Sequence, residues 1–419
     1  MTHFLGTVQG LTSDGTNIYA GGTFTEGGSQ IADQVARWDG TNWWPVGVST
    51  PGTQPEAGAI ALAVGGGYLF AGGNFTSIGS YAIPYVGYWN GTSWISMGAA
   101  GQVNAIVYDG TNAWVGGAFI SVIGVFSPGL ALYKVGTGWS SVGEASGGSR
   151  SVNAIARGGG SMYVGGNFTG IGSVHGLVSA SNIAVYNYST GTWSALGSGA
   201  NGTVSAILVT NGVVYVGGSF TSAGGVAANG IAEWNGSTWS ALGNGLTNSS
   251  GAGTVNALAT SGNTLYAGGT FTNADGAYAA GVAAWNGSTW PGLGSGLYSS
   301  AFGGQAGSAN ALVAIGNDLY VGGNFTSAGN KPSAYFAHWN NQLDYYPTPH
   351  PFLSRATWLP GNQFQFRLGG TSGESYILEA STNFFQWSPL LTNSATLYDF
   401  SDPNASLFPH RFYRAMLGP

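Results

Sequence analysis

The sequence predicts an all-β protein, a seven-bladed β-propeller followed by a small β-sandwich, and three observations predict it. A Gly-Gly-x-Phe segment recurs seven times. Short runs of β-branched and aromatic residues alternate with Gly, Asn and Ser turns, and no stretch has an apolar period near 3.6 residues. The repeat then stops near residue 345, and charged residues become denser. The seven segments end at Phe24, Phe75, Phe119, Phe168, Phe220, Phe271 and Phe325.

Each repeat unit contains four short strands. The fullest unit comprises residues 255–258, 264–271, 282–285 and 290–294, separated by turns or loops. Four antiparallel strands repeated about every 40 to 55 residues are typical of a propeller blade, and a closed ring of blades leaves only short sheet edges. We therefore expect each unit to form one blade.

The ends of the repeat region predict how the ring closes. The seventh unit follows the pattern as far as Trp339, but Asp344 stands where other units have a second Trp. At the other end, Phe4-Leu5-Gly6 resembles the Leu-Gly that ends other units and directly precedes the first inner strand. We expect both ends of the segment 1–345 to share blade seven.

A second domain is expected beyond the propeller. Residues 346–351 are rich in Pro and predict a stiff linker. Residues 352–419 predict an immunoglobulin- or fibronectin-like β-sandwich. Its expected strands are 363–368, 376–380, 390–391 and 412–415.

Composition limits the classes of partner. The chain has 9 Lys and Arg against 15 Asp and Glu, a formal charge of −6, and 6% charged residues in all. Lys134, Arg150 and Arg157 are the only basic residues between Arg37 and Lys331, so we expect no nucleic acid partner. The absence of Cys excludes disulfides and thiolate metal sites. No apolar run reaches the roughly 18 residues that a membrane-spanning helix needs.

The repeat resembles known families. The units Tyr-Val-Gly-Gly-Ser-Phe-Thr-Ser-Ala-Gly-Gly (215–225) and Ile-Ala-Glu-Trp-Asn-Gly-Ser-Thr-Trp-Ser-Ala-Leu-Gly (231–243) resemble repeats of secreted bacterial proteins that end in sorting or anchoring domains. They also resemble kelch propellers, which share the double glycine and the blade Trp. The tail, with Tyr-Ile-Leu-Glu-Ala-Ser-Thr at 376–382 and Arg-Phe-Tyr-Arg-Ala at 411–415, is similar to β-sandwich modules of such proteins. The resemblance implies an extracellular or cell-surface protein whose signal peptide has been removed.

The paired glycines and the Trp-Asn-Gly triplets of the repeat predict local backbone structure. The paired glycines of each unit are expected to allow close approach between backbones. The Trp-Asn-Gly triplets beginning at Trp89, Trp234 and Trp285 predict type I′ hairpin turns between the third and fourth strands.

Loop lengths distinguish the two faces of the ring. Turns between strands one and two, and between strands three and four, are short, whereas the loops after Gly-Gly-x-Phe and between blades are long. Both long kinds emerge on one face, here called the long-loop face, where we expect recognition. Tyr298 and Phe302 are predicted to form a sugar-stacking platform. Further candidate ligand-binding residues are Tyr278, Glu26, Asp33 and Asp275; the alternative is that these are solvated loop residues with no shared task.

A polar ring is predicted near one mouth of the central channel. The second position of the inner strands holds a polar residue in six of the seven units, and Ile60 is the exception. These side chains are placed to bind an ion or a sugar hydroxyl, or simply to satisfy backbone groups of the inner strands. They are Gln9, Asn104, Asn153, Ser205, Asn256 and Asn310.

Catalysis has weak support in the sequence. No paired carboxylates, Ser/His/Asp order or metal cluster stands out. A lyase needs a base and a cation that neutralises charge, and His175 with Arg150 or Arg157 is the only combination found. We expect no cofactor; the alternative is calcium at Asp14 or Asp33, although no Asp-x-Asp loop occurs.

The sequence therefore predicts a binding or adhesion protein that uses its long-loop face for carbohydrate or a cell-surface partner. A structural protein that self-associates through its weakly charged surface is one alternative. A lyase or hydrolase acting on polysaccharide is the other.

Overall fold

The structure is a computed structural model of the chain. It describes residues 4–48, 57–173, 176–291, 293–299, 305–329, 331–340, 352–361, 363–369, 375–383, 386–393 and 397–417. The chain divides into two compact units, Met1–Asn340 and Asn341–Pro419. Each unit is described by itself below.

The first unit is the predicted propeller, with seven antiparallel sheets that follow one another along the chain. The innermost strands are β1 (Val8–Ser13), β7 (Ala59–Gly65), β13 (Val103–Tyr108), β20 (Ser151–Gly158), β26 (Thr203–Thr210), β34 (Thr254–Ser261) and β41 (Ser308–Ile315). The second strands are β2 (Ile18–Gly22), β8 (Tyr68–Gly73), β14 (Ala113–Gly117), β21 (Ser161–Asn167), β27 (Val213–Ser219), β35 (Thr264–Thr270) and β42 (Asp318–Asn324). All seven innermost strands line one central cavity, which makes the arrangement a ring.

The outer strands complete the blades. The third strands are β5 (Val35–Trp38), β11 (Val86–Trp89), β17 (Leu130–Lys134), β24 (Ile183–Asn187), β30 (Ile231–Trp234), β38 (Val282–Trp285) and β45 (Phe336–Asn340). Blades one to five add a fourth strand: β6 (Trp43–Pro45), β12 (Trp94–Ser96), β18 (Gly138–Ser140), β25 (Thr192–Ala195) and β31 (Trp239–Ala241). Within the described residues, blades six and seven have three strands each.

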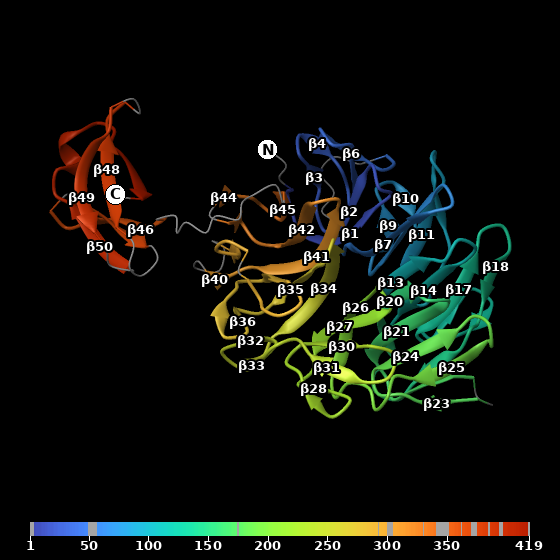
Figure 1. Cartoon of the computed structure of the whole chain (residues 1–419). Coiled ribbons are helices and arrows are strands. Elements are labelled where there is room, and N and C mark those ends of the chain that lie inside the picture. The colour runs from blue at the N-terminus through green and yellow to red at the C-terminus, as the bar shows by residue number, and fades with distance from the viewer. Residues whose placement is uncertain are drawn as a thin grey trace. The chain divides into compact units, whose positions relative to one another are not determined.

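The ring closes between blades one and seven, and Figure 1 shows β1 beside β41. Asn310 Nδ2 donates to the Val8 carbonyl at 3.3 Å, and the Phe4 amide donates to the Ala334 carbonyl at 3.3 Å. The Phe4 ring also packs against Phe336, with centroids 5.9 Å apart. The described strands of blade seven all come from residues 308–340. Residues 4–6, the N-terminal segment expected to join blade seven, contact that blade through the Phe4 amide, but Phe4 also forms a β-bridge with Gly27 of blade one. Residues 341–345, the other end of the predicted overlap, lie outside the described residues.

The paired glycines permit two close approaches in each blade. A Cβ on Gly217 would lie 2.5 Å from Cγ1 of Val255 in the next blade, and a Cβ on Gly218 would lie 2.0 Å from the Thr203 carbonyl oxygen of its own blade. The other pairs repeat this arrangement, for example at Gly165 and Gly166. The first glycine therefore sets the spacing between blades, and the second sets the spacing between the two inner strands.

In blades two to six, a Trp at the fourth-strand position links its blade to the preceding one. Its indole N–H donates to a backbone carbonyl at 2.8–3.0 Å in five successive pairs. The pairs are Trp94 to Val46, Trp139 to Met97, Trp193 to Val142, Trp239 to Leu196 and Trp290 to Leu242. These bonds give each blade a fixed orientation on its neighbour.

Replacing Trp239 with Phe is expected to lower the free energy of unfolding by about 1 kcal/mol beyond the effect of the smaller ring, because the buried Leu196 carbonyl loses its donor. Trp234→Phe is the matched control in the same blade, since the indole N–H of Trp234 forms none of the side-chain hydrogen bonds assigned in the described residues. Urea unfolding followed by tryptophan fluorescence measures both. Equal losses for the two variants would contradict a structural role for the hydrogen bond.

The third-to-fourth strand turns differ from the predicted type I′ form. Type I′ requires positive φ at both central residues. Here Gly91 has φ of +96°, but Asn90 does not have positive φ. Asn90 Oδ1 instead accepts the amides of Thr92 and Ser93, at 3.0 and 2.9 Å. The Asn thus caps a four-residue loop with its side chain, and the same pattern recurs at Asn235.

The long-loop face carries a small hairpin after each Gly-Gly-x-Phe segment, where the sequence predicted loops. The hairpin strands are β3 (Glu26–Gly27) with β4 (Gln30–Ile31), β9 (Ser77–Ile78) with β10 (Tyr81–Ala82), β15 (Ser121–Val122) with β16 (Val125–Phe126), β22 (Gly170–Gly172) with β23 (Val178–Ser179), β28 (Ser222–Ala223) with β29 (Val226–Ala227), β36 (Asn273–Ala274) with β37 (Ala277–Tyr278), and β43 (Ser327–Ala328) with β44 (Lys331–Pro332). Interblade strands extend three of these sheets: β19 (Glu144–Ser146), β32 (Leu246–Asn248) with β33 (Gly251–Ala252), and β39 (Leu297–Ser299) with β40 (Gln305–Ala306).

The second unit consists of two three-stranded antiparallel sheets, which agrees with the predicted sandwich. One is β46 (Phe352–Leu359), β47 (Gln363–Gly369) and β50 (Leu397–Asp402), and the other is β49 (Ser388–Asn393), β48 (Tyr376–Ser381) and β51 (Phe412–Leu417). A 3₁₀ turn, η2 (Ala405–Leu407), precedes the last strand. Phe366, Leu368, Tyr376 and Leu378 are buried between the sheets.

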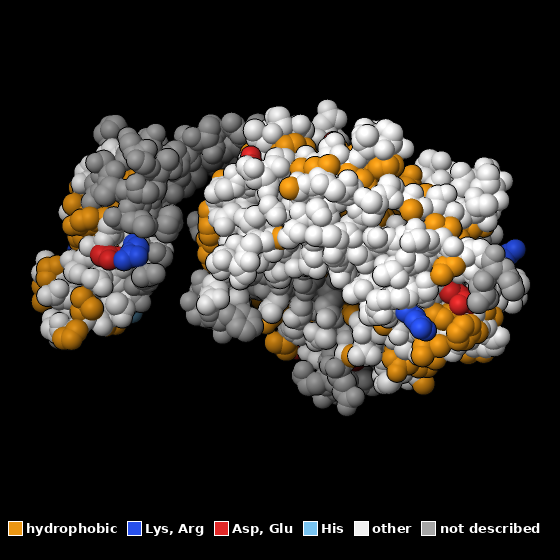
Figure 2. Space-filling model, turned by 90° about the horizontal axis from the view of Figure 1, so that it is seen from below, with side chains coloured by type: hydrophobic (Ala, Val, Ile, Leu, Met, Phe, Trp, Pro, Cys, Tyr) orange, Lys and Arg blue, Asp and Glu red, His pale blue; other side chains and the backbone are white. Residues whose placement is uncertain are grey.

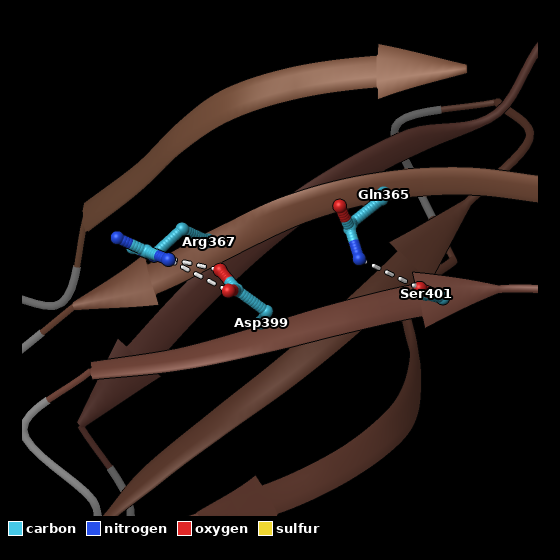
Figure 3. Close-up of polar contacts among 4 residues, drawn as sticks. All are labelled: Gln365, Arg367, Asp399 and Ser401. Atoms are coloured by element: carbon cyan, nitrogen blue, oxygen red, sulfur yellow. Dashed lines mark hydrogen bonds and ion pairs between the residues drawn. The ribbon is translucent and has the colours of Figure 1, made fainter. Parts of the chain in front are cut away.

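Charge in the second unit is used across strands. Arg367 donates from Nε and Nη2 to the two carboxylate oxygens of Asp399, at 2.6 and 2.7 Å, and Gln365 donates to Ser401 at 3.3 Å on the same pair of strands (Figure 3). These contacts join β47 to β50. Part of the higher charge density beyond the propeller therefore serves to pair strands of the second unit.

Candidate functional site

Tyr278 and Tyr298 lie together on the long-loop face. Tyr278 ends the hairpin of blade six in β37, and Tyr298 lies in β39, which pairs with β43 of blade seven. Their side chains are hydrogen-bonded, and burial followed by this bond raises the pKa of Tyr298 above its ordinary value. Tyr278 is 53% exposed. The structure therefore places one aromatic ring in solvent and anchors its hydroxyl on a second, partly buried ring.

The other predicted ligand-binding residues are spread around the ring. Asp275 turns the hairpin of blade six, where its Oδ1 accepts the Asn244 amide at 2.9 Å and the Asn244 side chain. Glu26 and Asp33 both belong to blade one, and Asp33 is only 6% exposed. Phe302 lies outside the described residues. Of the predicted set, the structure brings Tyr278 and Tyr298 into contact and gives Asp275 a role in holding the loop.

The two arginines of the catalytic hypothesis lie at opposite ends of one strand. Arg150 precedes β20 and has φ of +57°. Arg157 lies near the other end of the same extended strand, where its Nη1 donates to the Asp109 carbonyl at 2.6 Å. Seven residues of strand span more than 20 Å. Arg150 and Arg157 therefore cannot serve one site together, and His175 lies outside the described residues.

The structure shows exposed apolar side chains on the hairpins, which the sequence analysis did not single out. Ile120, Ile123 and Phe126 at the hairpin of blade three are 62%, 72% and 63% exposed. Other hairpins present Ile31, Leu177 and Val226. The available signal was an apolar residue within or beside a two-residue hairpin strand, which has no core to fill.

The central channel has the polar lining that the sequence predicted. The cavity has a volume of about 230 Å³. Asn104 Nδ2 donates to Asn153 Oδ1 at 3.0 Å, while Asn256 donates to the Ala309 carbonyl at 3.1 Å and Asn310 to the Val8 carbonyl. Each of these bonds crosses from one blade to the next. Four of the six ring residues thus satisfy neighbouring polar groups, as the structural alternative expects, whereas Gln9 Oε1 is buried without a hydrogen-bond partner among the described residues.

Neither carboxylate considered for calcium lies in a ligand cluster. Within the described part of the chain, no group of three or more His, Cys, Asp or Glu side chains converges. Asp14 accepts the amides of Thr16 and Asn17, the Asn17 side chain and the Tyr19 hydroxyl. Its oxygens are engaged in a turn.

The surface is weakly charged. Figure 2 shows polar and backbone atoms over most of the larger unit, with only a few Lys, Arg, Asp or Glu side chains. In the described residues, the propeller has one ion pair, His338 Nε2 with Asp318 at 3.0 Å, and the other three lie in the second unit. A search of the described residues finds no helix that is long and apolar enough to cross a membrane.

Comparison with known proteins agrees with the fold. The family described as the Rax2 C-terminal beta propeller domain matches residues 141–300. The chain is therefore similar to a β-propeller family over a part of its length, from the end of blade three to the loop before blade seven. A search of curated proteins found no match.

Two solved structures with distant similarity are a designed protein and a WD40 domain. The computationally designed Ika8 protein has 14% identity and a TM-score of 0.47, with 81% of this chain and 97% of that chain covered. The Pan2 WD40 domain of Neurospora crassa has 10% identity and a TM-score of 0.37, with 64% and 72% covered. The ring of seven sheets and the family match over residues 141–300 show that the chain is a β-propeller repeat protein, a fold that suits a binding or scaffold role.

Proposed function

We propose that this protein is an extracellular or cell-surface carbohydrate-binding protein that contacts its ligand through the long-loop face. The pair formed by Tyr278 and Tyr298 carries the proposal. An exposed aromatic ring offers an apolar face to the C–H groups of a sugar, and a phenolic hydroxyl held by a neighbour is fixed to exchange hydrogen bonds with sugar hydroxyls.

The setting of the pair supports this use. Tyr278 lies in a four-stranded sheet built from β33, β32, β36 and β37, and Tyr298 in the adjacent four-stranded sheet β40, β39, β43 and β44. Both rings therefore sit on hydrogen-bonded strands, which limits the conformational entropy lost on binding. The low charge content of the chain favours neutral, hydroxyl-rich ligands at the tyrosine pair.

A glycan array probed with the purified full chain tests the proposal. Tyr278→Ala is expected to reduce binding to the strongest array ligand at least tenfold, as loss of about 1.4 kcal/mol of ring contact would do. Tyr298→Phe keeps the supporting ring but removes its hydroxyl, so a smaller loss is expected. Tyr398→Ala, at an exposed ring in β50 of the second unit, is the control. The proposal fails if no glycan binds, or if Tyr278→Ala binds like the wild type.

A second candidate function is contact with a protein surface, either a partner or another copy of the chain. The exposed Ile120, Ile123 and Phe126 on one hairpin favour it, because clustered apolar side chains on a soluble protein often mark contact sites. Sedimentation equilibrium of the wild type and an Ile123→Ser/Phe126→Ser variant distinguishes self-association. If the apparent mass of the wild type rises with concentration and that of the variant does not, self-association through this hairpin is supported. A wild type that is monomeric at all concentrations contradicts self-association.

A further inference from the structure

A groove lies between blades one and two, at the end of the propeller opposite to the long-loop face. It has a volume of about 810 Å³ and is lined by residues of the turns and strands of both blades, including Asp14, Tyr19, Arg37, Tyr68 and Trp89. This volume lies within the roughly 300–1,000 Å³ typical of pockets for small ligands. Here the short-turn face means the end of the ring that carries the turns between strands one and two and between strands three and four.

The corresponding space between blades three and four is filled. The turn of blade three, Asp109-Gly110-Thr111-Asn112, repeats the Asp14 turn residue for residue. Blade four covers that turn with Arg157, which donates to the Asp109 carbonyl, and with Tyr188, whose hydroxyl donates to Asp109 Oδ2 at 3.2 Å. The ring of Tyr188 also packs on Trp114, with centroids 5.9 Å apart.

Two small residues keep the space open between blades one and two. Val64 pairs with Leu69 at the place in the repeat where Arg157 pairs with Met162. Gly91 lies two residues beyond Trp89, as Tyr188 lies two residues beyond Tyr186 in the equivalent strand. Because neither Val64 nor Gly91 can reach across, the Asp14 turn and the Tyr19 ring face open space.

The charged side chains of the groove differ in whether they already have hydrogen-bond or ion-pair partners. The Asp14 oxygens take four hydrogen bonds within their own turn and from Tyr19. The nearby Asp39 accepts the Thr41 and Asn42 amides and the Trp44 indole. In the described residues no ion pair involves Arg37. The Arg37 guanidinium interacts electrostatically with Asp39 and Tyr19, but with no ion pair of its own it is the charged donor in the groove that can pair with a ligand carboxylate.

We propose that this groove is a second binding site, which takes a saccharide unit bearing a carboxylate, such as a uronic acid residue. Arg37 holds the carboxylate, since a guanidinium matches a carboxylate with two parallel N–H bonds. Trp89 and Tyr68 contact the apolar face of the sugar ring, and the Tyr19 hydroxyl, oriented by Asp14, accepts from a sugar hydroxyl. The site is independent of the tyrosine pair on the long-loop face.

The test is isothermal titration of the full chain with trigalacturonate, and with maltotriose as the uncharged probe. Trigalacturonate is expected to bind the wild type at least tenfold more tightly than maltotriose, and Arg37→Gln is expected to remove that difference. Val64→Arg places at position 64 the side chain that closes the equivalent space, so binding should be lost. Val64→Thr, nearly the same in volume, should bind normally.

Each outcome bears on the proposal. Absence of trigalacturonate binding, equal affinity for maltotriose, or unchanged binding in Arg37→Gln or Val64→Arg would overturn it. Binding that is lost in Tyr278→Ala but retained in Val64→Arg would overturn it while supporting the long-loop site. Unfolding midpoints of all variants, measured in parallel, separate loss of binding from loss of fold, and a folded Val64→Arg protein that still binds is decisive against the groove.

Discussion

Gly218→Ala is expected to lower the free energy of unfolding of the propeller by about 3 kcal/mol. The new Cβ would lie 2.0 Å from the Thr203 carbonyl oxygen and 3.0 Å from the Val204 Cα, and both atoms belong to the backbone of the adjacent strand. The backbone of Gly218 does not have positive φ, so the cost is steric and requires β26 and β27 to separate. Urea unfolding followed by circular dichroism measures the loss.

Gly176→Ala provides the matched control for that substitution. Gly176 also lacks positive φ, and the nearest atom to its added Cβ, Ser173 Oγ, would be 3.7 Å away. We expect Gly176→Ala to change the unfolding midpoint little. If Gly218→Ala unfolded at the same urea concentration as the control, the close packing of the two inner strands would be contradicted.

Asp109→Ala is expected to cost about 2–3 kcal/mol, because it removes the acceptor of a buried donor. Asp109 Oδ2 accepts the indole N–H of Trp114 at 2.8 Å, and Trp114 is 1% exposed. Its other oxygen accepts the amides of Thr111 and Asn112. Thermal unfolding monitored by near-ultraviolet circular dichroism measures the change.

Asp39→Ala removes the same contacts of a turn, but without a buried indole and without a tyrosine hydroxyl such as that of Tyr188 at Asp109. Asp39 begins an identical Asp-Gly-Thr-Asn turn and accepts the indole N–H of Trp44 at 2.6 Å, but Trp44 is 41% exposed and can bond to water after the substitution. We therefore expect a clearly smaller loss at position 39. Equal losses at the two positions would show that the turn, and not the buried tryptophan, determines the effect.

The Asp109 carboxylate also makes the stability of the propeller depend on pH in the acid range. Burial opposes ionisation of Asp109, but hydrogen bonds from Asn112, Trp114, Thr111 and Tyr188 hold its pKa below 3.8. A group with a lowered folded-state pKa stabilises the fold above its unfolded value and loses that contribution as the pH falls through the folded value. The difference between wild type and Asp109→Ala should therefore be full near neutral pH and shrink below about pH 4.

The blade architecture was predictable because the same pattern of glycines, aromatic residues and turns occurs in all seven repeat units. The glycine pairs marked close backbone contacts, and the structure gives each glycine a different neighbour: Gly217 faces the next blade, and Gly218 faces its own inner strand. The predicted type I′ turn between the third and fourth strands was wrong, because the prediction considered only the backbone preferences of Asn90 and Gly91. The Asn side chain captured two amides and selected another loop.

The candidate site was predictable only in part. Tyr298 was singled out by its position in a long interblade loop, but its contact with Tyr278 depends on two hairpin sheets from different blades. The groove between blades one and two had no sequence signal in its own residues. It results from Val64 and Gly91, where blade four has Arg157 and Tyr188, and such an absence of bulk is visible only when the blades are superimposed in register.

The most direct measurement of the central claim, that the long-loop face binds carbohydrate, is hydrogen–deuterium exchange of the full chain with and without its strongest array glycan. The account predicts slower exchange in residues 273–278 and 297–299, which contain Tyr278 and Tyr298. Slower exchange confined to the turns of the short-turn face, or no change in either tyrosine segment at saturating glycan, would contradict it.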